Sequence, residues 1–171
     1  MDTQSAIRYA IWYRLTQDPE MIRLFGGPVP LHLVWAPKDA PLPYMTHRFQ
    51  NDRVDAIVKN GRWYLDFWDY SANAERIYAI AGRAIELMEC SVLGLVDSGS
   101  GYVWVCQAIQ QEQRDLLVAA RFYLQSDGDV PEDTTGIWHY ATTGIWHYAT
   151  TWNVRFTLSP AQIQRLINAK E

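Results

Sequence analysis

The residues best suited to chemistry are two histidines in identical settings, His139 and His147, each between a tryptophan and a tyrosine. Eight positions apart, they would share one face of a strand, too far apart for one metal ion unless the strand folds back. A metal site would also need a third ligand and second-shell partners. We therefore interpret both as residues without a metal, and His32 and His47 as ordinary strand residues.

A carboxylate pair near the end of one strand is the next candidate. Asp66 and Asp69 flank Trp68, and two carboxylates at a strand end could serve acid–base catalysis. Three positions apart in an extended strand, however, they point to opposite faces. The spacing favours a solvated face for one and a turn for the other.

An acidic stretch spans residues 126–133, with carboxylates at Asp127, Asp129, Glu132 and Asp133. It could attract a hard cation, but it lacks the spacing and closing glutamate of a calcium loop, so we expect an exposed acidic loop. The chain contains no P-loop, dinucleotide-binding turn or nucleophile elbow. We predict no catalytic residue, no metal and no cofactor.

The totals are typical of one globular domain. The chain has 171 residues, and its eight Trp and ten Tyr suggest a subunit contact as well as a core. The net charge of −4 argues against a dedicated nucleic-acid binder. The two cysteines, Cys90 and Cys106, form no metal or redox motif and favour a reduced, cytoplasmic setting. No signal core and no run long enough to span a membrane is present.

Helices are expected at the N-terminus and in the middle of the chain. Residues 2–16 carry an apolar stripe, and a second helix begins at the Asp18-Pro19 cap and stops at Gly26-Gly27. A central helix, capped by Ser71, continues to Met88 with apolar residues at helical spacing. The closing segment, 159–171, begins with a capping box and predicts a C-terminal amphipathic helix.

Strands are expected between these helices, by alternation of apolar and polar residues. The strongest runs over residues 62–70, where Trp63, Leu65 and Phe67 share one face, and a tight turn at Asn60-Gly61 joins it to a possible strand at 54–59. The proline-rich residues 37–43 predict a rigid loop. Other expected strands are 31–35, 44–49, 102–110, 116–125 and 152–158. The prediction is a single α+β domain with a mostly antiparallel sheet of about five to six strands packed against the N-terminal and central helices.

A tandem duplication precedes the last strand. Residues 134–141 read TTGIWHYA, and residues 142–149 repeat these letters without change. Because eight is even, a strand containing both copies keeps its faces in phase. We expect the second copy inside the sheet. The first copy is either an arm that reaches a neighbouring subunit or a tolerated insertion in a peripheral hairpin.

The order of these elements resembles the tail completion (tail terminator) proteins of long-tailed bacteriophages and phage-like gene transfer particles. The similarity covers roughly residues 2–158. It includes the Asp18-Pro19 helix start, the Gly26-Gly27 stop, Leu42-Pro43-Tyr44 after the proline-rich loop, and the strand-to-helix step at 69–74. A Gly-Ile-Trp-His-Tyr run also precedes the final strand. The C-terminal helix and the duplication depart from the family pattern.

The resemblance implies a structural virion protein without catalysis or cofactor. It implies a homo-oligomeric ring, usually of six subunits, that caps the head-proximal end of the tail tube. The partners would be the tail tube protein and head–tail connector proteins, and the ring would be assembled in the host cytoplasm. DNA would pass through the ring without sequence-specific binding, which an acidic balance suits.

Long irregular segments at sheet ends are the expected contacts with neighbouring subunits or the tube. The candidate residues are Pro37, Pro41, Pro43, Tyr44, Asp127, Asp129, Glu132, Asp133, Trp138, Tyr140, Trp146 and Tyr148. Two alternatives stay open. One is a head–tail connector, stopper or tail-tube-like subunit. The other is a small α+β enzyme or ligand-binding module with an aromatic pocket built on Trp63, Tyr64 and Trp68.

Overall fold

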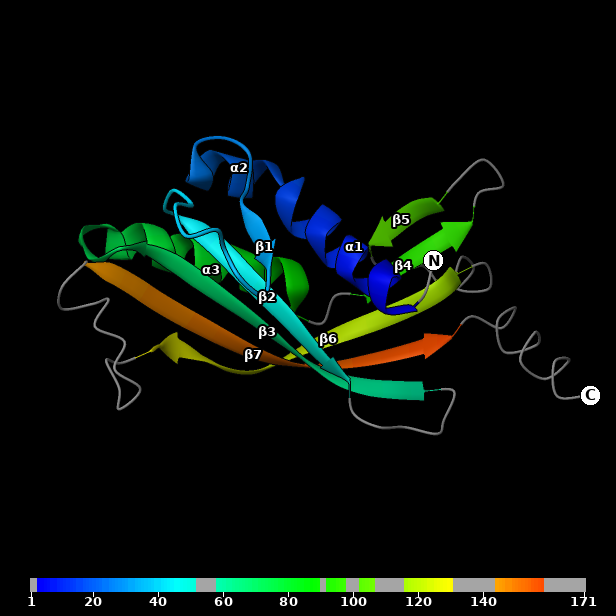
Figure 1. Cartoon of the computed structure of the whole chain (residues 1–171). Helices are drawn as coiled ribbons and strands as arrows, with labels where there is room; N and C mark the ends of the chain where they lie inside the picture. Colours follow the sequence, from blue (N-terminus) through cyan, green and yellow to red (C-terminus); the bar gives the residue numbers. More distant parts are fainter. Residues whose placement is uncertain are drawn as a thin grey trace, which may run out of the picture.

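The computed structural model describes residues 3–51, 58–89, 92–97, 102–106, 116–130 and 144–158. Within them the chain forms three α-helices and one seven-stranded sheet in the order β1-β2-β3-β7-β6-β4-β5. Every described strand pair is antiparallel except β1 with β2. Figure 1 shows the helices gathered on one side of the sheet, so the expected α+β class is confirmed. No described helix is both long and apolar enough to cross a bilayer.

The two N-terminal helices form where the sequence predicts them. Helix α1 (Thr3–Thr16) buries Ile7 and Ile11. Helix α2 (Pro19–Phe25) begins where the Asp18 carboxylate accepts the Met21 N–H at 2.9 Å. Its capping residue Gly26 has φ +72°, a left-handed conformation that glycine adopts without steric cost.

The core lies between the sheet and the helices and is centred on β3 (Val58–Tyr70). Trp63, Leu65 and Phe67 are fully buried, as their alternation predicts. The Trp63 ring packs on Trp152 of β7 (Ile145–Leu158) and on Phe122 of β6 (Leu116–Asp129), with centroids 5.6 Å and 5.4 Å away. Because Trp63 lies on this face, it cannot share a pocket with Tyr64 and Trp68, and that predicted pocket is wrong.

Helix α3 (Ala74–Met88) starts later than the sequence suggested. A short 3-10 turn, η1 (Ser71–Asn73), precedes it, and its N-cap is Asn73 rather than Ser71. The predicted apolar stripe is confirmed from Ile77 to Met88.

An ion pair holds this helix to the end of β3. Asp69 is completely buried and accepts both Arg76 guanidinium donors at 2.7 Å and the Tyr70 N–H at 2.8 Å. Asp66 and Asp69 point to opposite faces of β3, as their spacing predicts. The prediction that Asp69 lies in a turn is wrong, because its side chain is buried at the end of the strand.

The predicted hairpin turn at Asn60-Gly61 is also wrong, because β3 runs through it as a continuous strand. Gly61 pairs with Asn51 of β2 (Tyr44–Asn51). A Cβ there would lie 2.7 Å from the Phe49 ring, so glycine is required by close packing rather than by a turn. Residues 52–57, with most of the possible strand at 54–59, lie outside the described structure.

The remaining strands extend the sheet beyond the prediction. β1 (Leu31–Leu33) forms one edge, and residues 37–43 form no strand, as expected. β4 (Val92–Asp97), which lies between α3 and β5 (Tyr102–Cys106) in the chain, was not predicted.

The predicted acidic loop at residues 126–133 is partly strand. β6 continues to Asp129, so residues 126–129 are strand rather than loop, and the register shifts between Leu124 and Ser126. β7 begins inside the second repeat copy, which confirms the prediction for Ile145–Ala149. The first copy and the predicted C-terminal helix lie outside the described residues.

Candidate functional site

One face of the sheet has none of the described helices on it, and we call it the open face (Figure 1). The pleat places alternate residues of each strand there, opposite the buried ones. In β3 these are Arg62, Tyr64, Asp66, Trp68 and Tyr70, none of which is buried. The register aligns Tyr44 and His147 with Trp68 on this face.

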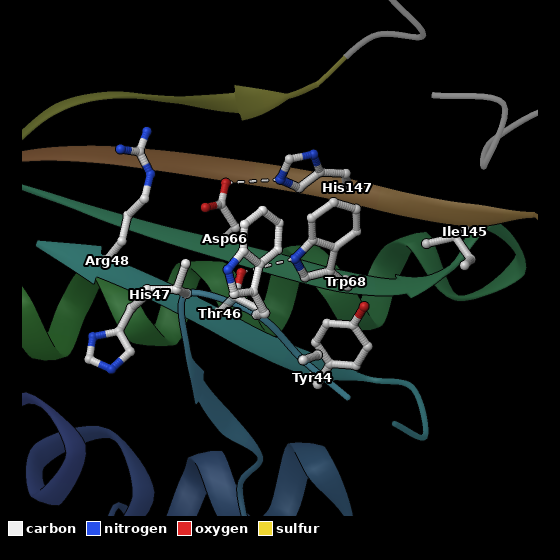
Figure 2. A pocket seen from close by; sticks show the side chains of 11 residues that line it. Tyr44, Thr46, His47, Arg48, Asp66, Trp68, Ile145 and His147 are labelled. Carbon is white, nitrogen blue, oxygen red and sulfur yellow. Dashed lines mark hydrogen bonds and ion pairs between the residues drawn. The ribbon is translucent and has the colours of Figure 1, made fainter. Parts of the chain in front are cut away.

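A histidine–aspartate pair lies on the open face. The His147 Nε2 is 2.9 Å from the Asp66 Oδ1, joining β7 to β3. The imidazole stacks on the Trp68 indole with centroids 3.8 Å apart and planes 7° from parallel. The Trp68 Nε1–H donates to the Thr46 hydroxyl at 3.2 Å, so the three strands β2, β3 and β7 are tied together here (Figure 2).

A groove of about 390 Å³ lies over this pair and continues to the edge of the sheet. Tyr44, Thr46 and Trp68 line it from the strands, and residues 34–36 line it from the segment after β1. Figure 2 shows Tyr44 beside Trp68, with Ile145 farther along β7. The lining is mainly aromatic and apolar, and its polar side chains include the His147–Asp66 pair, Thr46 and Arg48.

The chain is tightly bent where it borders this groove. The Trp35 N–H donates to the Leu33 carbonyl at 2.8 Å, closing a three-residue γ-turn around Val34 at φ +67°. That conformation is strained for a β-branched residue. The Val34 N–H holds it in place by donating to the His47 carbonyl at 2.8 Å. Trp35, which follows this turn, is 82% exposed.

The His147–Asp66 pair is the part of this arrangement that could take part in chemistry. A histidine oriented by an aspartate resembles the base of a catalytic triad, but the reaction also needs a nucleophile within reach. The Thr46 hydroxyl, which also lines the groove, accepts a hydrogen bond from the Trp68 Nε1–H. In the part of the chain that the structure describes, no three metal-ligating side chains gather at one point.

His47 faces the other side of β2 and supports the core. Its Nδ1 accepts the Trp63 Nε1–H at 3.2 Å. Burial, aided by the positive charge of Arg8, lowers the pKa of His47 to about 4. The side chain is therefore neutral near pH 7, as its acceptor role requires.

The predicted interface residues fall into separate places. Tyr44 lines the groove, and Pro37 and Pro41 are exposed in the segment between β1 and β2, with Pro43 half-buried. Glu132, Asp133, Trp138 and Tyr140 lie outside the described residues. Contact of these residues with a neighbouring subunit stays a prediction.

The two described aspartates of the acidic stretch are bound within the subunit. Asp129 accepts the Trp146 Nε1–H at 2.8 Å and the Tyr78 hydroxyl at 2.9 Å, and Asp127 accepts the Tyr148 hydroxyl at 2.5 Å. Burial and the Asp127 carboxylate raise the pKa of Tyr148. These contacts fasten the ends of β6 and β7 on the helix-covered side.

Sequence reasoning missed a group of arginines on the open face. Arg48, Arg62, Arg121 and Arg155 lie on four different strands and are all exposed. They are far apart in the chain, and only the strand register brings them together. The available signal was that each lies at a polar position of an alternating strand.

Comparisons with known proteins give a likeness of fold. No family model matches the chain, and no curated protein matches it. Among solved structures, a chain in the virion of a native gene transfer agent particle superposes with a TM-score of 0.54 at 12% identity. The match covers 90% of this chain and 96% of the other. The two chains thus share their fold over nearly their whole lengths.

Proposed function

We propose that this chain is a structural virion protein, a tail terminator subunit that closes into a ring at the head-proximal end of a tail tube. The observation that carries the proposal is the near-complete overlap of its fold with a chain of a gene transfer agent virion. The order of elements resembles that of tail terminator proteins, and it includes the Asp18 cap and the Gly26 stop of α2. The role is assembly rather than catalysis.

The proposed partners are copies of this chain, usually six, the tail tube protein and head–tail connector proteins. A ring contact is heterologous and uses two different patches on each subunit. Exposed apolar side chains suit such patches. Leu33, Val34 and Trp35 form one run at the end of β1, and Tyr9, Trp12 and Tyr13 form another on α1.

Native mass spectrometry of the purified chain over a concentration series tests ring formation. We expect a species of six chain masses. If only monomers form, tail tubes are added, and ring formation on the tube is read by electron microscopy. Subunits that neither close alone nor bind the tube end would refute the proposal.

Tube length separates a terminator from a connector, stopper or tube-like subunit. Tubes polymerised with the ring protein should stop at a defined length and carry the protein at one end. Labelling along the whole tube would indicate a tube subunit, and labelling of connectors without an effect on tube length would indicate a stopper.

The groove favours a second candidate, a ligand-binding module. Its volume of about 390 Å³ lies within the range of small-molecule sites, and its lining is largely apolar. A fragment screen by NMR tests this candidate. Specific shifts of the His147 and Trp68 resonances by a ligand, together with a monomer at every concentration, would favour it over the ring.

A further inference from the structure

We infer that the open face carries a binding row for the phosphate backbone of double-stranded DNA. The row consists of Arg48, Arg62, Arg155 and Arg121, one arginine from each of four adjacent strands. The inference goes beyond the proposed ring, because a single subunit carries the whole row.

The register sets the four arginines on a diagonal. Arg48 pairs with Tyr64, two residues from Arg62 on β3, and Arg155 pairs with Asn60, two residues on the other side of Arg62. Arg121 lies directly opposite Arg155. Diagonal neighbours in a sheet are about 7–8 Å apart and direct neighbours about 5 Å, so the row is roughly 20 Å long. At ~3.4 Å of rise per phosphate on one strand, it spans about six phosphates.

The charge of this face is opposite in sign to that of the whole chain. In the described parts of β2, β3, β6 and β7, four arginines point to the open face, and Asp66 is the only carboxylate there. Asp66 is already bound to His147. The chain's net charge of −4 therefore conceals a positive surface.

Three of these arginines have no carboxylate partner among the described residues. Within the described residues, no ion pair involves Arg48, Arg121 or Arg155. By contrast, Arg23, Arg76 and Arg83 on the helix side each pair with a carboxylate at 2.6–2.7 Å. Two like charges directly opposite in a sheet, as Arg121 and Arg155 are, destabilise the pair. An external polyanion would relieve this repulsion.

Aromatic side chains accompany the row. The Arg48 guanidinium carbon lies 3.8 Å from the centroid of the Tyr64 ring, which holds it over the sheet. Tyr123, two residues from Arg121, pairs with Asn153 on the same face. Figure 2 shows Arg48 at the far end of the groove from Ile145. Guanidinium groups bind phosphate oxygens in a bidentate way, and a row spaced along one line matches a backbone better than a compact acidic peptide.

Fluorescence anisotropy with a mixed-sequence DNA duplex tests the row through its salt dependence. Four phosphate contacts predict a slope of about −3.6 for log K against log salt concentration. Affinity should then fall about 150-fold between about 50 and 200 mM salt. Arg121→Ala and Arg155→Ala should each reduce the slope to about −2.7 and the loss to about 40-fold.

Matched controls separate the row from general charge. Arg23→Ala removes an exposed arginine of the helix side and should leave the slope unchanged. Arg121→Ala should not lower the thermal midpoint, because the removed charge is exposed and repels Arg155. An unchanged slope in both row variants, or equal binding of polyglutamate of the same charge, would overturn the inference.

The two proposals fail separately. If the protein forms a hexamer but its DNA affinity does not depend on salt concentration, the proposed ring stands and the proposed arginine row is refuted. If the protein stays monomeric but binds DNA with the expected dependence of affinity on salt concentration, the row stands and the ring is refuted.

Discussion

Arg76→Ala is the most informative stability test, because it leaves a buried carboxylate without its charge partner. Asp69 has a side-chain exposure of 0%, whereas Arg76 is 37% exposed. Removing the arginine leaves the negative charge in the core with one backbone N–H as its remaining donor. Breaking a buried ion pair in this way costs about 3–5 kcal/mol.

The reverse variant should cost less. In Asp69→Ala, the unpaired Arg76 guanidinium can turn to water, and the loss is mainly hydrogen bonds, about 1–3 kcal/mol. The structure thus predicts an order as well as a size, with Arg76→Ala the more destabilising of the two. In the double variant Asp69→Ala/Arg76→Ala, part of the Arg76→Ala loss should return, because no buried charge remains.

Arg23→Ala is the matched control. Arg23 pairs with Glu20 at 2.6 Å, but the two side chains are 68% and 42% exposed, and such surface pairs contribute about 0–1 kcal/mol. Thermal unfolding followed by circular dichroism is the assay. For a chain of this size 1 kcal/mol shifts the midpoint by about 2–4 °C, so Arg76→Ala should lose roughly 6–20 °C. Equal midpoints for the Arg76 and Arg23 variants would refute the reasoning.

Three further predictions follow from separate features. Gly61→Ala should lower the free energy of unfolding by about 1–3 kcal/mol, because the new methyl group overpacks against Phe49. In urea unfolding, the double variant Gly61→Ala/Phe49→Ala should lose less than the sum of the two single variants. Strictly additive losses would contradict the clash. Because the folded pKa of His47 lies near 4, below its ordinary 6.5, the unfolded chain binds the extra proton between these values. Stability should therefore fall by about 3 kcal/mol as pH drops from about 6.5 to 4, and His47→Leu should flatten that slope; an unchanged slope would assign the pH dependence elsewhere. Deleting residues 134–141 or 142–149 gives the same protein, and its thermal midpoint should stay within about 2–4 °C of the parent, because the remaining copy supplies the Ile145–Ala149 pairings with β3. Loss of ring formation in that folded protein would identify the duplication as an assembly arm, and full retention would leave it as a tolerated insertion.

The parts of the fold that follow local rules could be predicted from the sequence. The Asp18 cap, the glycine stop after α2 and the alternation of Trp63, Leu65 and Phe67 each depend on neighbours a few residues away. The place of the second repeat copy in the sheet was predicted because this copy runs directly into the strand that contains Trp152. These features are where propensity, pattern and tertiary structure agree.

Errors arose where distant residues decide the local structure. Asn60-Gly61 has the composition of a tight turn, yet Phe49 on the neighbouring strand needs the space that glycine leaves. The sequence around Asp69 is typical of a turn. The side chain is buried because Arg76, on the following helix, pairs with it. The arginine row could not be predicted either, since a net charge of −4 says nothing about which face each charge occupies.

The register shift in β6 decides which charges meet which side of the sheet. Before it, the odd-numbered Arg121 and Tyr123 point to the open face. After it, Ser126 pairs with Thr151 on that face, and the odd-numbered Asp127 and Asp129 turn toward the helices. If Gln125 were paired with Thr151 instead of bulging, Asp127 and Asp129 would lie on the open face with the arginines and reduce its positive charge. The bulge at one residue thus separates charge across the thickness of the sheet and gives the subunit an electric dipole normal to it, which would orient it before contact with a polyanion.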